Sequence, residues 1–258
     1  MTKITIPETW LQPQWSVPDK VFACVTTKLG GVSRAPFESL NLGLHVGDDA
    51  ECVRKNREQL SQILPFDSPV QWLEQVHGIE VINASEDGIT RIADAAYIDC
   101  IGVVAAVMTA DCLPVFFASR NAKRVAIAHA GWRGLLNGIL ENTLARFPDD
   151  PSDVSVWFGP AIGQCHFEVG EEVRDAFLSA SSAQKGLSRT ISQAFQAGDT
   201  DHKFFADIYA LARLRLQALG VVDITGGGHC TYCESDHFYS YRREARTGRF
   251  ASIIGLMR

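Results

Sequence analysis

Residues 103–134 read VVAAVMTADCLPVFFASRNAKRVAIAHAGWRG, and this segment contains three short apolar runs of strand length. The runs are Val103–Met108, Val115–Phe117 and Val125–Ala128. They are apolar at consecutive positions, as expected for β-strands that are covered on both faces. After residue 129 the apolar residues follow a helical period, at Trp132, Leu135, Leu136, Ile139, Leu140 and Leu144. The segment therefore predicts buried strands followed by an amphipathic helix.

Strand and helix patterns alternate on both sides of this segment. Further strands are predicted at Val21–Thr27, Val70–Leu73, Val81–Ile82, Val154–Phe158, Val221–Ile224, Phe238–Tyr241 and Ala251–Leu256. Helices are predicted from Asp48 to Leu64, with Asp48 or Asp49 near the N-cap, and at Gly170–Leu178 and Phe205–Leu219. No repeat period or low-complexity linker interrupts the pattern. We therefore expect a single α/β domain over residues 1–258 with a mixed β-sheet, after a loosely ordered lead-in at residues 1–19.

The composition is that of a globular protein and excludes several classes of partner. The chain has 258 residues, of which 46% are hydrophobic, and its 30 acidic and 24 basic side chains give a net charge of −6. Without a basic tract, nucleic acid and anionic membrane surfaces are not expected as partners. No apolar stretch approaches the roughly 18 residues of a membrane span, and the N-terminus has no signal-peptide pattern. We expect a cytoplasmic protein whose seven cysteines are core residues, metal ligands or nucleophiles rather than disulfides.

Three polar segments each follow an apolar run and each contain one nitrogen or sulfur donor. The donors are His77, Cys112 and His129. Loops at strand ends are where α/β proteins bind ligands, and catalytic zinc keeps three protein ligands and one open position. The alternative is that Cys112 is a small buried hydrophobe and that the two histidines only form hydrogen bonds. Spacing alone leaves both interpretations open.

A second cysteine motif lies near the C-terminus. His229, Cys230 and Cys233 form a His-Cys-x-x-Cys pattern, but a closed structural zinc site needs four ligands. His237 is the only nearby candidate for the fourth ligand. The alternative is that these are ordinary loop and core residues, because one Cys-x-x-Cys pair is not diagnostic.

The glycines of His129–Gly134 place main-chain N–H groups at the start of the predicted helix, where an anion is favoured. Arg133 in this segment would add a guanidinium suited to phosphate. The alternative is a solvated arginine on the first helical turn.

Seven motifs in order make the chain similar to the laccase-domain family, whose bacterial members include polyphenol-oxidase-like proteins, purine nucleoside phosphorylases and a peptidoglycan editing factor. The motifs are Thr26–Ser33, Ser39–Gly43, Glu74–Gly78, Thr109–Val115, His129–Gly134, Gly159–Gly163 and Ser240–Arg243. The resemblance extends from about Val21 to the C-terminus.

The resemblance implies a single α/β domain with a mixed sheet sandwiched by helices, and Zn²⁺ held by His77, Cys112 and His129. It implies phosphorolysis of adenosine, inosine, guanosine and methylthioadenosine, with adenosine deamination as a side activity. An older assignment is a copper-dependent phenol oxidase. Three ligands argue against that assignment, because multicopper oxidases need several histidine-rich copper sites.

For phosphorolysis we expect nucleoside and phosphate as the small-molecule partners, with Arg133 and Arg242 holding the phosphate. Asn41 is a candidate for a sugar or base contact. Asp111, next to the cysteine ligand, is a candidate general acid or base, or a group that orients a histidine ligand. The alternative for Asp111 is a carboxylate that caps a turn.

Two rival functions remain open at this level. In the first, Cys112 is a nucleophile with His129 as its base, in a hydrolase that removes a wrong amino acid from a cell-wall precursor. In the second, the zinc is structural and the protein is a non-enzymatic partner of other proteins.

Overall fold

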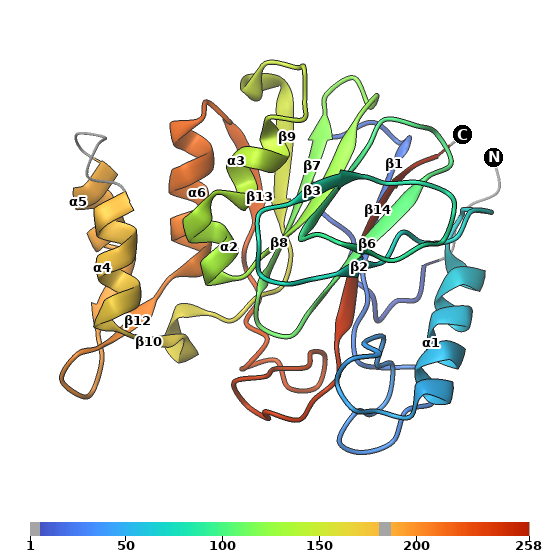
Figure 1. Ribbon diagram of the computed structural model, residues 1–258, viewed down its shortest axis with the longest axis horizontal. Coiled ribbons are helices and arrows are strands. Elements are labelled where there is room, and N and C mark those ends of the chain that lie inside the picture. Colours follow the sequence, from blue (N-terminus) through green and yellow to red (C-terminus); the bar gives the residue numbers. More distant parts are fainter. Residues whose placement is uncertain (1–5, 181–186, 258) are drawn as a thin grey trace.

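The structure, a computed structural model, describes residues 6–180 and 187–257 and has two stacked β-sheets at its centre (Figure 1). The larger sheet has the order β13-β9-β7-β8-β5-β3. It is mixed, because β13 is parallel to β9 and β3 to β5, whereas the central pairs are antiparallel. Its strands are β3 (Val81–Asn83), β5 (Ala95–Ile98), β7 (Leu113–Ser119), β8 (Val125–Ala130), β9 (Val154–Phe158) and β13 (Asp223–Gly226).

The second sheet is antiparallel and packs on one face of the first. It consists of β1 (Val21–Val25), β14 (Phe250–Leu256) and β6 (Val104–Thr109), in that order. Strand β7 shows how both of its faces are covered. Phe116 belongs to the apolar cluster between the two sheets, whereas Val115 and Phe117 belong to the cluster on the helical side. The consecutive apolar residues of the sequence are thus explained by the two-residue period of a strand covered on both sides.

Helices cover the two outer faces, which gives four layers. α2 (Trp132–Asn137), α3 (Ile139–Leu144) and α6 (Ile208–Ala218) pack on the larger sheet, and α1 (Ala50–Ile63) packs on the smaller one. The predicted α/β class with a mixed sheet between helices is confirmed. The sequence pattern did not reveal that the strands divide into two sheets.

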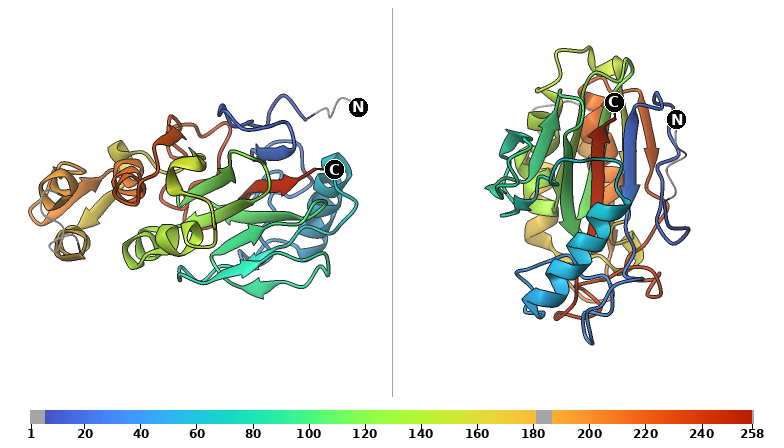
Figure 2. Two further views of the ribbon diagram at one scale, coloured as in Figure 1. Left: turned by 90° about the horizontal axis from the view of Figure 1, so that it is seen from above. Right: turned by 90° about the vertical axis from the view of Figure 1, so that its right-hand side faces the viewer.

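Smaller elements complete the fold. The strands are β2 (Leu73–Glu74) paired with β4 (Arg91–Ile92), and a sheet of β10 (Glu168–Gly170), β12 (Lys203–Ala206) and β11 (Phe195–Ala197). The helices are α4 (Glu171–Ala180), α5 (Leu187–Ser192) and the short 3-10 turns η1 (Pro151–Asp153) and η2 (Gln164–His166). Figures 1 and 2 show α4 and α5 at one end of the molecule and α1 at the other.

Several predicted elements differ from the structure for identifiable reasons. The predicted helix after His129 is two helices, because Gly138 adopts a left-handed φ of 105° between them. Phe205 lies in β12, so α6 begins only at Ile208. The predicted strand Phe238–Tyr241 is wrong. Its residues form turns and irregular chain, and its apolar pattern reflects the burial of Phe238 and its neighbour rather than strand pairing.

The expected lead-in covers residues 1–19, of which residues 1–5 lie outside the described part. The described residues 6–19 are better ordered than expected. Trp10 is buried with a relative exposure of 6%, and Leu11 pairs with Val25 of β1. This segment therefore packs against the smaller sheet instead of leading loosely into the domain.

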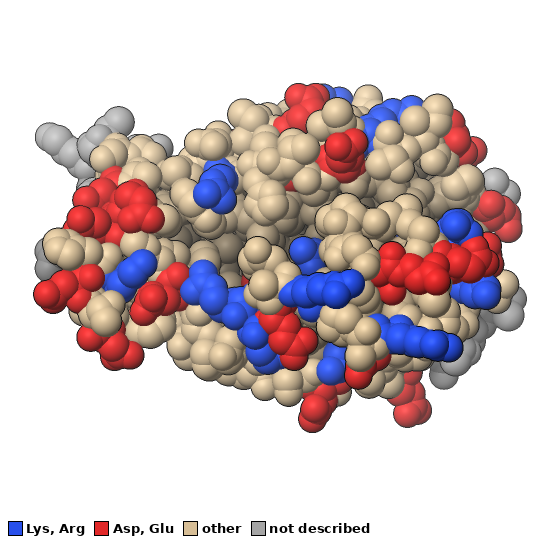
Figure 3. Space-filling model, turned by 60° about the horizontal axis from the view of Figure 1, so that its bottom comes forward, with Lys and Arg blue, Asp and Glu red and all other residues tan. Residues whose placement is uncertain are grey.

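The surface of the described chain bears on two expectations about partners. No helix in residues 6–180 or 187–257 combines the length and apolar character needed to cross a membrane. Figure 3 shows Lys and Arg side chains in a band across the face formed by the lower loops, although the net charge is −6. The negative charge of the chain is thus compatible with a locally positive surface.

Candidate functional site

Three donor side chains meet at one edge of the two sheets. Cys112 lies in the connection from β6 to β7, and His129 is near the end of β8, inside the strand rather than beyond it. β7 and β8 are antiparallel with Pro114 opposite His129, so the start of one strand lies beside the end of the other. His77 follows β2. The three donor atoms lie within 4.8 Å of one another, and Cys112 Sγ is 3.7 Å from His77 Nε2.

A fully buried carboxylate, Asp94, orients this group. His129 Nδ1 donates to Asp94 Oδ1 at 2.8 Å, which leaves Nε2 of the same ring for the donor cluster. The main-chain N–H groups of Val76, His77 and Gly78 also donate to the Asp94 carboxylate, at 3.2, 3.0 and 2.6 Å. One side chain therefore fixes both the ring of one histidine and the loop of the other.

Sequence reasoning missed Asp94. Its position carried a signal, because it is the only charged residue between Ile92 and Ile98 and it immediately precedes a fully buried strand. An isolated carboxylate at such a position must be paired when it is buried, and a histidine from the next segment is a natural partner.

The ionisation of Cys112 and His129 is mutually coupled. Desolvation would raise the pKa of the Cys112 thiol, but the charge and hydrogen bond of His129, with those of His77, lower that pKa to about 6. Desolvation would lower the pKa of His129, but the Cys112 thiolate and the Asp94 carboxylate raise it to about 9. The site therefore favours the thiolate, which is the form that binds metal.

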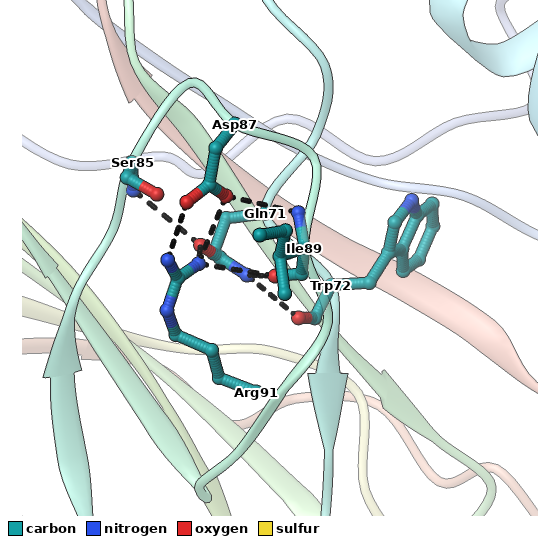
Figure 4. Close-up of polar contacts among 6 residues, drawn as sticks. All are labelled: Gln71, Trp72, Ser85, Asp87, Ile89 and Arg91. Atoms are coloured by element: carbon teal, nitrogen blue, oxygen red, sulfur yellow. Dashed lines mark hydrogen bonds and ion pairs between the residues drawn. The ribbon is translucent and has the colours of Figure 1, made fainter.

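A network of polar contacts joins the segment before β2 to the loop before β4 (Figure 4). Gln71 is fully buried, and its Nε2 donates to the main-chain oxygens of Trp72 at 2.9 Å and Ile89 at 2.7 Å. Its Oε1 accepts from Arg91 Nη1 at 2.8 Å, and Arg91 also pairs with Asp87. These contacts close the loop before β4 and hold that strand beside β2, from which the His77 loop emerges.

Gly131 allows the cluster to be this compact. A Cβ atom at this position would lie 2.7 Å from His77 Cδ2 and 3.1 Å from Cys112 Sγ, so any side chain would displace the donors. The donor set is two imidazoles and one thiolate, and the other ring nitrogen of His129 is hydrogen-bonded to the Asp94 carboxylate. This set fits a zinc ion that has three protein ligands and an open fourth position.

The donors open into a cavity of about 390 Å³. This is the size of a small-molecule site. Its walls are mostly apolar or aromatic, with a few polar groups, and are formed in addition to the three donors by Gln75, Met108, Thr109, Ala110, Asp111, Trp132, Ile162, Phe167, Ile208, Tyr241, Arg242 and Arg249.

Asp111 lies on the wall of this cavity in a left-handed backbone conformation, with φ of 94°. Its carboxylate accepts hydrogen bonds from Thr231 Oγ1 at 2.6 Å and from the main-chain N–H of Arg242 at 2.7 Å. Such strain is typical of functional sites. The carboxylate that orients His129 is Asp94 and not Asp111, whose role as a general acid or base stays a prediction.

Two arginines reach the cavity, and one of them was predicted. Arg242 lines it, as does Arg249, which sequence reasoning had not singled out as a site residue. Arg133 does not line it: the side chain is exposed and its guanidinium lies 4.4 Å from the ring centroid of Trp132. Asn41 is fully buried, and its Oδ1 accepts the main-chain N–H of Arg249 at 2.9 Å. Asn41 thus supports the segment of Arg249 instead of facing the cavity.

The second cysteine motif also meets further donors. Cys230 and Cys233 lie with Cys165 and His166 in a cluster whose donor atoms are within 4.8 Å of one another. The histidines considered from the sequence are not in this group. His229 Nδ1 forms a hydrogen bond with the Glu234 carboxylate at 2.8 Å, and the His237 ring lies 6.2 Å from the Phe238 ring, centroid to centroid.

The family model described as "Multi-copper polyphenol oxidoreductase laccase" matches residues 22–257. The chain belongs to this family. The resemblance inferred from the seven motifs is therefore confirmed, and it covers nearly all of the chain.

Relatives within this laccase-like family have names that point to nucleosides. The chain is 49% identical over 247 residues to a protein of Pseudomonas aeruginosa named a purine nucleoside phosphorylase, covering 96% of this chain and 98% of that one. A purine nucleoside phosphorylase named YfiH, from Escherichia coli, is also 49% identical, with 95% and 98% covered. Among solved structures, a DUF152 protein of Neisseria meningitidis has a TM-score of 0.90 at 46% identity, covering 97% of this chain and all of the other.

Proposed function

We propose that this protein is a zinc-dependent purine nucleoside phosphorylase, a transferase that moves ribose from a purine base to inorganic phosphate. Adenosine, inosine, guanosine and methylthioadenosine are the proposed nucleosides. The observation that carries the proposal is that one cavity combines His77, Cys112 and His129 with aromatic walls and two arginines. The names of relatives 49% identical over almost the whole chain support the same activity.

The base is proposed to bind against the aromatic walls. Trp132, Phe167 and Tyr241 line the cavity from different segments, and Ile162 adds apolar surface to the wall. A purine is flat and aromatic, so stacking and apolar contact contribute to its binding. Because these contacts do not depend on the exocyclic groups, they suit several purines rather than one.

The phosphate is proposed to bind between Arg242 and Arg249. Among the described residues, each guanidinium donates hydrogen bonds only from Nη1, and only to main-chain oxygens. Arg242 Nη1 donates to Glu168 at 2.8 Å and to His166 at 3.4 Å. Arg249 Nη1 donates to Gly248 at 2.9 Å and to Thr247 at 3.1 Å. Nε and Nη2 of both arginines are left for an anion, in the geometry that suits phosphate oxygens. Desolvation lowers the pKa of Arg249, which indicates that its charge is held in a partly water-excluded place where it interacts strongly with an anion.

In the reaction a phosphate oxygen attacks the anomeric carbon of the ribose, and the bond from that carbon to the base nitrogen breaks. The leaving base takes the electron pair and gains a proton, and Asp111 on the cavity wall is the candidate group for that proton exchange. When bound, zinc supplies a Lewis acid that stabilises negative charge on a ligand oxygen. His77, Cys112 and His129 would hold it, with Asp94 fixing the orientation of His129.

The other activities are less well supported. Multicopper oxidation needs several histidine-rich sites. The two clusters of the described residues that could hold a metal ion contain only three histidines, His77, His129 and His166. A hydrolase that uses Cys112 as its nucleophile needs a thiolate that no metal holds. Deamination of adenosine remains a proposed side activity at the same metal. None of the seven cysteines forms a disulfide, which supports a reducing compartment such as the cytoplasm.

The test is a screen of the purified protein with the four nucleosides, with and without phosphate, alongside its zinc content. We expect release of free base that requires phosphate, loss of turnover and of the zinc held in the cavity in Cys112→Ala, and neither change in Cys100→Ala, which removes an exposed thiol. Base release without phosphate would indicate a hydrolase, and inosine formed from adenosine without base release would indicate a deaminase. Full turnover in metal-free protein would contradict the zinc assignment.

A further inference from the structure

The four residues Cys165, His166, Cys230 and Cys233 come from two segments that are far apart in the sequence. Cys165 and His166 belong to η2, and the other two lie in the turns that follow β13. The segments meet because Ala161 pairs with Cys230 in parallel, and because Thr231 N–H donates to the main-chain oxygen of Ala161 at 3.0 Å.

The distances within this group match a tetrahedral metal site. With Zn–S bonds of about 2.3 Å and Zn–N bonds of about 2.0 Å, the edges of a tetrahedron are about 3.8 Å between two sulfurs and about 3.5 Å between sulfur and nitrogen. Cys165 Sγ lies 3.7 Å from Cys233 Sγ, and His166 Nδ1 lies 3.4 Å from Cys233 Sγ and 3.1 Å from Cys165 Sγ. The fourth donor, Cys230 Sγ, is within 4.8 Å of the others.

The surroundings of the cluster also suit a bound metal. Tyr232 stacks on the His166 ring at a centroid distance of 3.9 Å, which fixes the ring, and Gly163 N–H donates to Cys230 Sγ at 3.2 Å. Three thiolates with one neutral imidazole and Zn²⁺ have one net negative charge. Arg243 adds a positive charge at the turn itself, since its Nη1 donates to the main-chain oxygens of Thr231 and Tyr232, between the two cysteines.

We propose that Cys165, His166, Cys230 and Cys233 bind a second zinc ion, as a closed structural site separate from the cavity. Four protein ligands of which three are thiolates are typical of structural zinc, whereas the three ligands of the cavity site leave a position open. The role of this site follows from what it joins. η2 is followed directly by Phe167 on the cavity wall, and the Cys230–Cys233 turn contains Thr231, whose hydroxyl holds Asp111. The second zinc therefore fixes two segments that shape the cavity.

The first test is zinc content in protein purified without chelators and under reducing conditions. We expect two zinc ions per chain in the wild type, and one each in Cys233→Ser, Cys165→Ser and Cys112→Ser. Cys100→Ser is the matched control, because Cys100 is an exposed thiol outside both clusters, and it should keep two. One zinc in the wild type and none in Cys112→Ser would overturn the proposal. Because the count does not depend on turnover, it stands apart from the test of the phosphorylase activity.

A second measurement covers variants that fail to fold. Cobalt is substituted for zinc in the wild-type protein, and the visible and near-ultraviolet spectrum is recorded. With both sites loaded, four thiolates, Cys112 and the three of this cluster, contribute thiolate-to-cobalt charge transfer. Charge transfer from a single thiolate per chain would overturn the proposal. Intact mass after alkylation reports the thiols. Protection of four thiols, Cys112 and the three of this cluster, that is lost on chelation supports the site, whereas protection of Cys112 alone would contradict it. A mass lower by two hydrogens, from a Cys165–Cys233 disulfide in the purified protein, would overturn it.

Discussion

Asp94 offers the sharpest test of how the donor cluster is built, through the substitution Asp94→Asn. The change keeps the shape of the side chain and removes its charge. Oδ1 of Asp94 accepts from His77 N–H and His129 Nδ1, and Oδ2 accepts from Val76 N–H and Gly78 N–H. An asparagine has one carbonyl oxygen and one NH₂ group, so in either orientation two of the four donors face another donor.

The size of the effect follows from those two lost bonds. A hydrogen bond to a charged group contributes about 1.5–3 kcal/mol, so the free energy of unfolding of metal-free protein should fall by about 3–6 kcal/mol. Removal of the partner of a histidine ligand typically lowers metal affinity by about 10- to 100-fold. We expect a zinc dissociation constant higher by that factor, because both the His129 ring and the His77 loop lose their support.

The assay is competition for zinc with a chromophoric chelator, in a Cys233→Ser background so that only the cavity site binds. Urea unfolding in the presence of a chelator measures the stability separately from the metal. Asp99→Asn is the control, since Asp99 is an exposed carboxylate five residues further on. A zinc dissociation constant for Asp94→Asn within twofold of the control would refute the role assigned to Asp94.

Three further results are expected at other positions. Arg249→Gln should lower kcat/KM for phosphate about 10- to 100-fold, because a charge-assisted hydrogen bond that contributes about 1.5–3 kcal/mol is lost. Initial rates at varied phosphate concentration check this prediction. An unchanged kcat/KM would mean that Arg249 does not bind the phosphate. Gly131→Ala should weaken zinc binding at the cavity site at least tenfold, because the alanine Cβ would lie 2.7 Å from His77 Cδ2. Competition with a chelator measures the zinc affinity, and an affinity equal to that of the wild type would show that this close contact does not matter. Hydrogen bonds from Arg91 and from the Ile89 N–H hold the pKa of Asp87 well below its usual range. The ionised Asp87 therefore stabilises the fold at a pH above its unfolded pKa, and this contribution is lost as the pH falls through the lower, folded pKa. NMR titration should show the low pKa in the wild type and a return toward the ordinary value in Arg91→Gln.

The elements that the sequence predicted well are those whose pattern depends on local burial. Val154–Phe158 is a strand with the predicted bounds, and the predicted helix from Asp48 to Leu64 is α1 with Asp49 as its N-cap. In both cases the relevant interactions, burial on two faces or a side chain that caps the first turn, are encoded within a few residues. The division into two sheets was not predictable, because a strand covered by another sheet has the same apolar pattern as one covered by a helix.

The candidate site divides in the same way. His77, Cys112 and His129 stood out because each donor follows an apolar run, and the structure brings them together. The support for these donors depends on contacts between distant segments, such as that between Asp94 and His129. The Cys-x-x-Cys pair was visible, but its partner Cys165 lies 65 residues before Cys230, and only the meeting of the two segments identifies it.

The anion site shows the limit of motif reasoning most clearly. Arg133 lies within a glycine-rich motif and resembles a phosphate ligand in sequence, yet its guanidinium lies over the Trp132 ring and its side chain is exposed. Arg249, which has no motif of its own, lies in the irregular chain immediately before β14 and reaches the cavity from there. Direction of a side chain is set by the packing of the segment that carries it, which a linear pattern does not record.

The connection from β6 to β7 has a consequence for how metal loading affects the whole domain. Asp111 and Cys112 form the short corner at which the chain leaves the smaller sheet and enters the larger one. An ion held by Cys112 and by His129 of β8 joins this corner to the neighbouring strand. Loss of the ion should therefore increase hydrogen exchange in β6 and β7 together, in two different sheets, while β1 and β13 at the far edges keep their protection. The metal would therefore link the two sheets, in addition to acting as a Lewis acid in the cavity.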